Sequence, residues 1–143
     1  MTTAMMAALR LVTLGLTALS YQTQMVCKQL SYENKNQADY GPLRVPSVRG
    51  IATDVQGVAV PGVCVGIFTE QDHKLIAVTE TDDRGRFEFK DTLKGNYRLV
   101  AKYEGFSPAN AKLRIEPSSK HKKPLALHMK FQGIDTASFV GLK

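Results

Sequence analysis

The chain has 143 residues, 43% of them hydrophobic and 22% charged, with 19 Lys and Arg against 13 Asp and Glu. This length fits one domain with tails and excludes a multidomain enzyme, while the composition excludes a disordered tether. Two cysteines are too few for a disulfide-rich miniprotein. Beyond the first twenty residues no apolar run is long enough to span a bilayer, so no transmembrane span is predicted in the mature chain.

Residues 1–20 predict a secretory signal peptide. Arg10 supplies a positive charge before the apolar run of residues 11–19, and Ala18 and Ser20 are the small residues that signal peptidase requires. Cleavage after Ser20 would remove this segment. An uncleaved anchor and a buried helix are the alternatives, but a run of nine residues is short for a membrane span. The predicted location is secreted, or the periplasm or cell envelope.

The two cysteines, Cys27 and Cys64, both remain after such cleavage, and export places them where disulfides persist. Val63, Val65 and Ile67 alternate along a predicted strand and share one face of it, so Cys64 lies on the other face. If the valines face the core, a Cys27–Cys64 disulfide would hold the N-terminal arm across the outer face of a sheet. The alternative is two free thiols in a cytosolic chain.

Residues 21–47 are rich in Gln and Asn and show no sustained hydrophobic period, which predicts a polar N-terminal arm. The folded domain is expected to span residues 48–131. The C-terminal tail, residues 132–143, either adds an edge strand or docks across the domain.

From Val48 onward the hydrophobic pattern has the period of β-strands, and no helical stripe occurs. Turn residues rich in Gly and Asp separate the predicted strands. The strands are expected at residues 48–54, 63–69, 75–81, 86–90, 97–103, 111–115 and 124–131. This alternation of short strands and turn residues predicts an all-β fold, a seven-stranded antiparallel Greek-key β-sandwich.

The order of short motifs along this region resembles the carboxypeptidase regulatory-like domain family. The motifs are Gly50 to Gly57, Val60-Pro61-Gly62-Val63, Thr81-Asp82-Asp83-Arg84-Gly85-Arg86-Phe87-Glu88-Phe89, Leu93-Lys94-Gly95-Asn96-Tyr97-Arg98-Leu99 and Gly105-Phe106. The resemblance implies a transthyretin-like (prealbumin-like) sandwich. It also implies a non-catalytic accessory domain, here in the stand-alone exported form.

Structural roles are expected for the motif residues. Val65, Phe87, Phe89, Tyr97 and Leu99 are assigned to the core, and Gly50, Pro61, Gly62, Gly85, Gly95 and Gly105 to turns and strand entries. Asp54, Asp82 and Asp83 are expected to bond nearby backbone amides. A calcium site at Asp82 and Asp83 is disfavoured, because adjacent carboxylates point to opposite sides.

No catalytic constellation is evident in the sequence. His73, His121 and His128 lack the spacing of metal ligands, and neither a nucleophile elbow nor a phosphate loop occurs. A hydroxyisourate hydrolase shares this sandwich but requires a C-terminal Tyr-Arg-Gly-Ser, whereas residues 138–143 read Ser-Phe-Val-Gly-Leu-Lys. No catalytic residue, cofactor or metal is therefore predicted.

Two kinds of binding function remain. The first is protein interaction or an envelope-structural role, through an exposed sheet edge or the loop ends. The second is carbohydrate binding, for which the candidate exposed aromatics are Tyr32, Tyr40, Tyr103, Phe131 and Phe139. The basic run Lys120-His121-Lys122-Lys123 is interpreted as a solvated loop tip between strands, and no nucleic-acid partner is expected.

Overall fold

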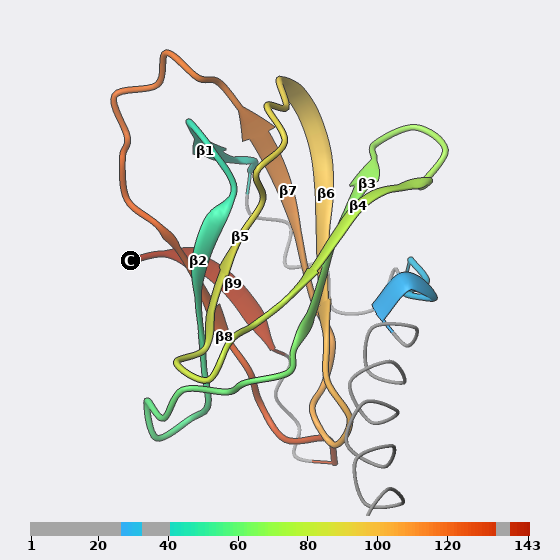
Figure 1. Cartoon of the computed structure of the whole chain (residues 1–143), viewed down its shortest axis with the longest axis vertical. Coiled ribbons are helices and arrows are strands. Elements are labelled where there is room, and N and C mark those ends of the chain that lie inside the picture. Colours follow the sequence, from blue (N-terminus) through green and yellow to red (C-terminus); the bar gives the residue numbers. More distant parts are fainter. Residues whose placement is uncertain (1–26, 33–40, 134–137) are drawn as a thin grey trace, which may run out of the picture.

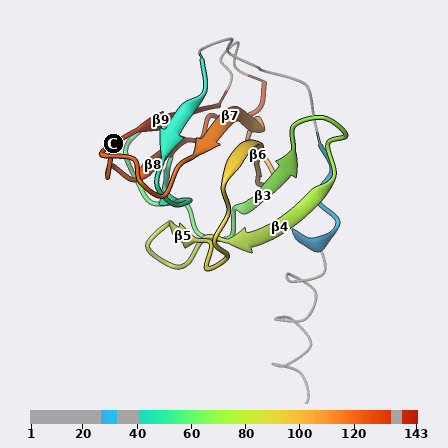
Figure 2. The same ribbon diagram turned by 90° about the horizontal axis from the view of Figure 1, so that it is seen from above.

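The computed structural model describes residues 27–32, 41–133 and 138–143. These residues form two β-sheets, one of five strands in the order β1-β7-β6-β3-β4 and one of four in the order β5-β2-β8-β9. Figure 1 shows the strands running roughly along the long axis, and the view from above shows them enclosing a common interior (Figure 2). The prediction of an all-β fold with two sheets is confirmed.

Within each sheet, the strands lie side by side in an order that differs from their order in the sequence. The five-stranded sheet contains β1 (Leu43–Val45), β7 (Ala109–Ile115), β6 (Gly95–Lys102), β3 (Cys64–Thr69) and β4 (Leu75–Glu80). The four-stranded sheet contains β5 (Arg86–Glu88), β2 (Arg49–Thr53), β8 (Leu125–His128) and β9 (Phe139–Leu142). Within the described residues no helix is long and apolar enough to cross a membrane.

The described residues form nine strands, where the sequence pattern predicts seven. The two additional strands are β1, which precedes the predicted domain start, and β9, which makes the C-terminal tail an edge strand. They have three and four residues, too short for a period-2 pattern to stand out.

An antiparallel arrangement throughout was also expected, and this is wrong for two strand pairs. β1 pairs with β7 in parallel, and β2 pairs with β8 in parallel. Each pair joins segments far apart in the sequence, so no hairpin turn imposes an antiparallel direction on them. Local turn chemistry therefore could not reveal these pairings.

The main core lies between the two sheets. Val63, Val65 and Ile67 are fully buried there, together with Leu99, and Phe87 and Phe89 are nearly so. Tyr97 lies at the rim, half-buried against this cluster, and its hydroxyl donates a hydrogen bond to the Lys94 carbonyl at 3.1 Å.

The turns combine left-handed glycines with aspartate side chains that accept backbone hydrogen bonds. Oδ1 of Asp82 accepts from the amides of Arg84 and Arg86, both at 2.9 Å, and Asp54 makes the equivalent pair with Gln56 and Val58. Positive φ angles occur at Gly62, Gly85, Gly95 and Gly105. Pro61 immediately precedes Gly62 in the turn that leads to β3.

Candidate functional site

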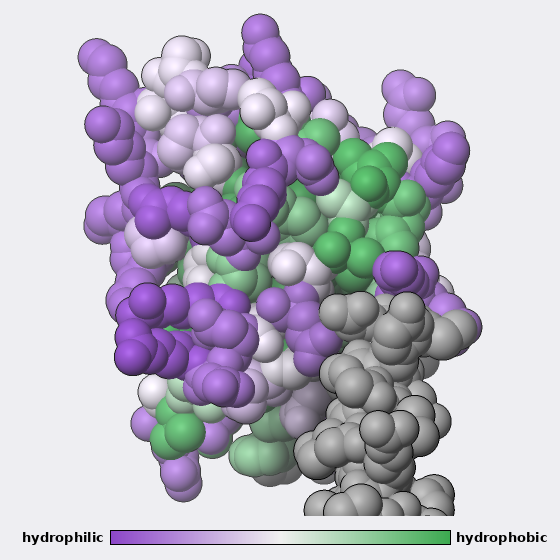
Figure 3. Space-filling model, in the orientation of Figure 1, coloured by the Kyte–Doolittle hydropathy of each residue, from purple (hydrophilic) through white to green (hydrophobic). Residues whose placement is uncertain are grey.

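A disulfide joins Cys27 to Cys64, with their Cα atoms 5.2 Å apart. It holds the N-terminal segment, residues 27–32, on the outer face of the five-stranded sheet, where Cys27, Leu30, Cys64, Phe68 and Val100 form a second apolar cluster. In Figure 3, hydrophobic side chains gather over the β3–β4 hairpin beside this segment. The predicted disulfide is therefore present, and it buries Cys64 rather than leaving it on an open face.

Gly66 makes room for the N-terminal segment. A Cβ atom at Gly66 would come within 2.5 Å of Leu30 Cδ2, so only glycine lets the leucine pack this closely on β3. Tyr32 continues the contact by stacking on His73, with ring centroids 3.8 Å apart, and by meeting the edge of Phe68. Alternation in the sequence indicates which face Cys64 occupies, but nothing in it marks Gly66 as a packing site.

Exposed hydrophobic side chains gather in the loops at one end of the sandwich. The loops joining β2 to β3 and β6 to β7, and residues 129–133 after β8, lie at the lower end in Figure 1. They carry Val55 (62% exposed), Val58 (56%), Tyr103 (41%) and Phe131 (45%). We call these four residues, with the half-buried Phe106, the apolar end.

The aromatic side chains of the apolar end form a line of rings. Phe106 stacks on Phe131 with centroids 4.7 Å apart, and Tyr103 lies 5.8 Å from Phe106. A backbone bridge between Phe106 and Phe131 joins their two loops. The line is therefore built by long-range pairing, and the sequence marks Tyr103 and Phe131 as candidates without bringing them together.

The other aromatic candidates lie elsewhere. Phe139 is on β9, where it stacks on His128 with ring centroids 4.4 Å apart, and the Lys130 ammonium is 5.4 Å from its ring centre. Tyr32 belongs to the N-terminal segment, and Tyr40 lies outside the described residues. The predicted aromatics thus do not form one platform.

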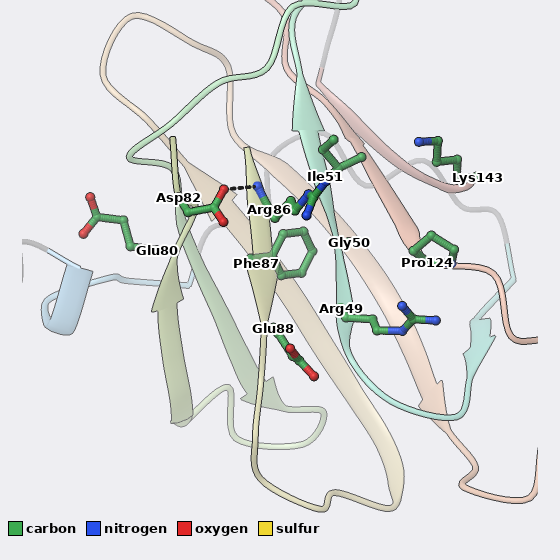
Figure 4. A pocket seen from close by; sticks show the side chains of 10 residues that line it. All are labelled: Arg49, Gly50, Ile51, Glu80, Asp82, Arg86, Phe87, Glu88, Pro124 and Lys143. Carbon is green, nitrogen blue, oxygen red and sulfur yellow. Dashed lines mark hydrogen bonds between the residues drawn. The ribbon is translucent and has the colours of Figure 1, made fainter. Parts of the chain in front are cut away.

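A shallow hollow of about 480 Å³ opens beside β2 and β5 (Figure 4). The charged residues among its lining are three cationic and three anionic side chains: Arg49, Arg86, Lys143, Glu80, Asp82 and Glu88. None of the residues that line it is Ser, Thr, Cys or His. Its charges balance, so the hollow does not select a ligand of either sign.

The carboxylate of Asp82 in this hollow is engaged by its own turn. Hydrogen bonds from the Arg86 amide, and then from the Arg84 amide, lower the pKa of Asp82 below its usual value of 3.8, while desolvation opposes this effect. A carboxylate held ionised by backbone amides is suited to fixing a hairpin rather than to exchanging protons near neutral pH.

The histidines serve no common site within the described part of the chain. His73 stacks on Tyr32 and His128 on Phe139, while His121 lies in the exposed loop between β7 and β8. Across residues 27–32, 41–133 and 138–143, no group of three or more His, Cys, Asp or Glu side chains could hold a metal ion.

The basic run, residues 120–123, lies in the loop between β7 and β8, where the sequence places it. The Arg49 guanidinium donates a hydrogen bond to the Lys122 carbonyl at 3.3 Å, which ties this loop to β2. The four side chains are exposed.

Comparisons with known proteins give a family and several distant structural likenesses. No curated protein sequence matches the chain at a significant level. The crystal structure of 3-chlorocatechol 1,2-dioxygenase from Rhodococcus opacus 1CP is 12% identical, covering 86% of this chain and 77% of that one, with a TM-score of 0.38. A likeness at this level carries no argument about activity.

The sequence model described as "Carboxypeptidase regulatory-like domain" matches residues 47–128, more than half of the chain. The matched range runs from just before β2 to the end of β8, so it takes in strands of both sheets. The chain therefore belongs to the carboxypeptidase regulatory-like domain family.

Proposed function

We propose that this protein is a non-catalytic, exported binding module that contacts a protein or cell-envelope partner through its apolar end. The observation that carries the proposal is the line of Tyr103, Phe106 and Phe131, with two of the three rings more than one-third exposed. Tyr and Phe are enriched at the centres of protein interfaces, because they bury a large area with few rotatable bonds. Membership of a family of accessory domains supports the same function.

Export is supported by two independent features. The first is the signal-peptide pattern of residues 1–20, and the second is the Cys27–Cys64 disulfide, since such bonds persist outside the cytoplasm. A transthyretin-like topology with a Greek-key connection remains part of the proposal, on the strength of the family.

Site-specific crosslinking tests the proposed interface. A photoreactive amino acid at Phe131 or Tyr103, in protein expressed in its own host, is expected to yield one discrete crosslinked species from the envelope fraction. The matched control is Ile76 on β4, a comparably exposed apolar residue away from this end. Equal yields at Ile76 and Phe131, or no discrete product at either end position, would refute the proposed interface.

Carbohydrate binding is the second candidate, because the same half-exposed rings offer flat faces to sugar rings. A glycan array separates the two functions. Binding of a defined glycan that is lost in Tyr103→Ser and Phe131→Ser, but kept in Ile76→Ser, would favour carbohydrate. A blank array together with a discrete crosslinked protein would favour protein interaction.

A further inference from the structure

The Cys27–Cys64 disulfide lies between two opposite charges on the outer face of the five-stranded sheet. Cys64 is in register with Glu80 on β4 and with Lys102 on β6. Residues directly opposite each other on paired strands share a face of the sheet, and Cys64 is on the outer face with the second apolar cluster. The disulfide therefore has a carboxylate on one flank and an ammonium on the other.

The Glu80 carboxylate is close to the bond itself. Its Oε2 atom is 4.0 Å from Cys27 Sγ, and its Oε1 atom would be 3.6 Å from a Cβ atom at Gly62, so the carboxylate packs between this glycine and the disulfide. Figure 4 shows the Glu80 side chain pointing away from the other side chains of the hollow. On the opposite flank, Lys102 Nζ donates a hydrogen bond to Ser31 at 3.2 Å, so its ammonium is engaged with the N-terminal segment.

Access to the disulfide is restricted on most sides. Cys27 is 5% exposed and Cys64 is 8% exposed. The hydrogen bond between Ser31 and Lys102 ties the N-terminal segment over the β6 side. On the other side, β4 is the last strand of the sheet among the described residues, and Glu80 is the last residue of β4. A thiol that approaches the sulfurs over this edge of the sheet therefore passes the Glu80 carboxylate.

We propose that the Glu80 carboxylate makes the Cys27–Cys64 bond resistant to reduction by anionic small-molecule thiols such as glutathione. In this reaction a thiolate attacks one sulfur and forms a new bond to it, while the bond between the cysteines breaks and its electron pair leaves on the other sulfur. A second thiolate then attacks the mixed disulfide. Two external thiols are thereby oxidised to one disulfide, and both cysteines are reduced.

Both directions of attack place negative charge beside Glu80. Attack on Cys64 makes Cys27 the leaving thiolate, and the sulfur of Cys27 is 4.0 Å from the carboxylate. Attack on Cys27 brings an anionic thiolate to the sulfur next to the carboxylate. Like charges at such a distance repel each other, and partial burial reduces screening by solvent and salt. The carboxylate therefore slows every thiolate, and most of all a thiol with a net negative charge.

The bond that Glu80 protects keeps the N-terminal segment on the sheet. Its reduction would leave the segment attached by side-chain contacts alone and would free it to expose Phe68 and Val100, which are 2% and 0% exposed. Loss of this cover would create a new apolar surface on the outer face of the sheet. The inference concerns the redox stability of the fold, so it goes beyond the function proposed above and does not depend on what the apolar end binds.

The test is the rate at which thiols reduce the folded, disulfide-bonded protein, measured by alkylation of the released cysteines and intact mass. Glutathione, which has a net negative charge, is compared with cysteamine, which has a positive charge. In Glu80→Gln, the ratio of the glutathione rate constant to the cysteamine rate constant should rise by about fivefold. The difference from the native protein should shrink at about 1 M salt, where screening acts over about 3 Å.

The matched control is Glu70→Gln, which removes the same charge from the other end of the β3–β4 hairpin. Glu70 is exposed and lies about 20 Å along the strand from Cys64, so the ratio should change by less than about 1.5-fold. A substitution that only loosens the N-terminal segment would accelerate both thiols equally. An unchanged ratio in Glu80→Gln, an equal change in Glu70→Gln, or a rate that does not depend on thiol concentration would each overturn the proposal.

Discussion

Gly50 and Gly141 are on strands of the same sheet, but their surroundings differ. A Cβ atom at Gly50 would overlap the backbone carbonyl of Leu125 on the neighbouring strand β8, whereas nothing lies within 4 Å of one at Gly141. Backbone cannot move aside as a flexible side chain can. Gly50 is therefore required for the close approach of β2 and β8, a role that is distinct from forming a turn.

Gly50→Ala should lower the free energy of unfolding by about 1–3 kcal/mol, through overpacking between the two strands. Gly141→Ala is the matched control and should leave the stability unchanged or raise it by up to about 1 kcal/mol. Urea denaturation followed by circular dichroism measures both. Similar effects of the two substitutions would contradict the close-approach explanation.

Asp82 gives the protein a pH-dependent contribution to stability. Folding lowers the pKa of Asp82 below its usual value of 3.8, so the folded state favours the ionised carboxylate. The resulting stabilisation is fully present at pH values above the pKa of Asp82 in the unfolded chain, and it is lost as the pH falls through the lower pKa of the folded state. Asp82→Asn should therefore be less stable than the native protein at neutral pH. The difference should shrink when thermal unfolding is repeated at increasingly acid pH, and a difference that stays constant would contradict this assignment.

At the scale of elements, the N-terminal segment is attached by one covalent bond and a few side-chain contacts. Leu30 packs over Gly66, Tyr32 stacks on His73, and Lys102 donates a hydrogen bond to Ser31 at 3.2 Å. The disulfide spans a sequence separation of 37 residues. It therefore links the segment to β3 far more firmly than these contacts alone.

Cys27→Ser/Cys64→Ser should lower the free energy of unfolding by about 4 kcal/mol, the chain-entropy estimate for a loop of this length. The sandwich should keep its far-UV circular dichroism, because the main core is a separate cluster. Hydrogen exchange should accelerate in residues 27–32. Unchanged exchange there would show that packing, and not the disulfide, holds the segment.

The β1–β7 pair offers a second prediction at this scale. Arg44→Glu would replace a like-charge neighbour of Arg114 by an opposite charge, and should raise the free energy of unfolding by about 0.2–1 kcal/mol. Arg44→Gln should give a smaller gain, because it only removes the repulsion. Thermal unfolding at low and high salt would check this, and a loss of stability in Arg44→Glu would contradict the arrangement of charges.

At the scale of the whole molecule, the exposed large hydrophobic residues of the loops are concentrated at one end of the sandwich. Val55, Val58, Tyr103 and Phe131 are exposed at one end. The loops at the other end, including residues 69–74 and 116–124, are mainly polar and charged.

Export is a property of the whole chain and is tested by intact mass. Protein recovered from its own host should begin at Tyr21 and should be lighter than the reduced form by two hydrogen atoms. Recovery by cell fraction completes the measurement. A full-length, thiol-reduced species in the cytosol would refute export and leave the fold unaffected.

Strand-forming segments were predictable because period-2 alternation and turn residues act over a few neighbours. The ranges expected around Ile67, Phe87 and Leu99 each contain a strand or its core residues. The four-residue β9 realises one of the two alternatives that the sequence leaves open for the C-terminal tail, an edge strand, here paired with β8. The three-residue β1 lies in the segment predicted as a polar arm, because its stability comes from pairing with the distant strand β7.

The candidate sites were predictable to the same extent, because only patterns that act between near neighbours in the sequence can be recognised in it. Sequence alternation determines that Cys64 faces away from the valines, and the motif order determines the family and the all-β class, because both are encoded locally. The tertiary structure alone decides that Phe131 stacks on Phe106, that Gly66 receives Leu30 and that Arg98 lies opposite Lys112. Strand register and loop docking depend on long-range pairing, and no local pattern specifies which segments will meet.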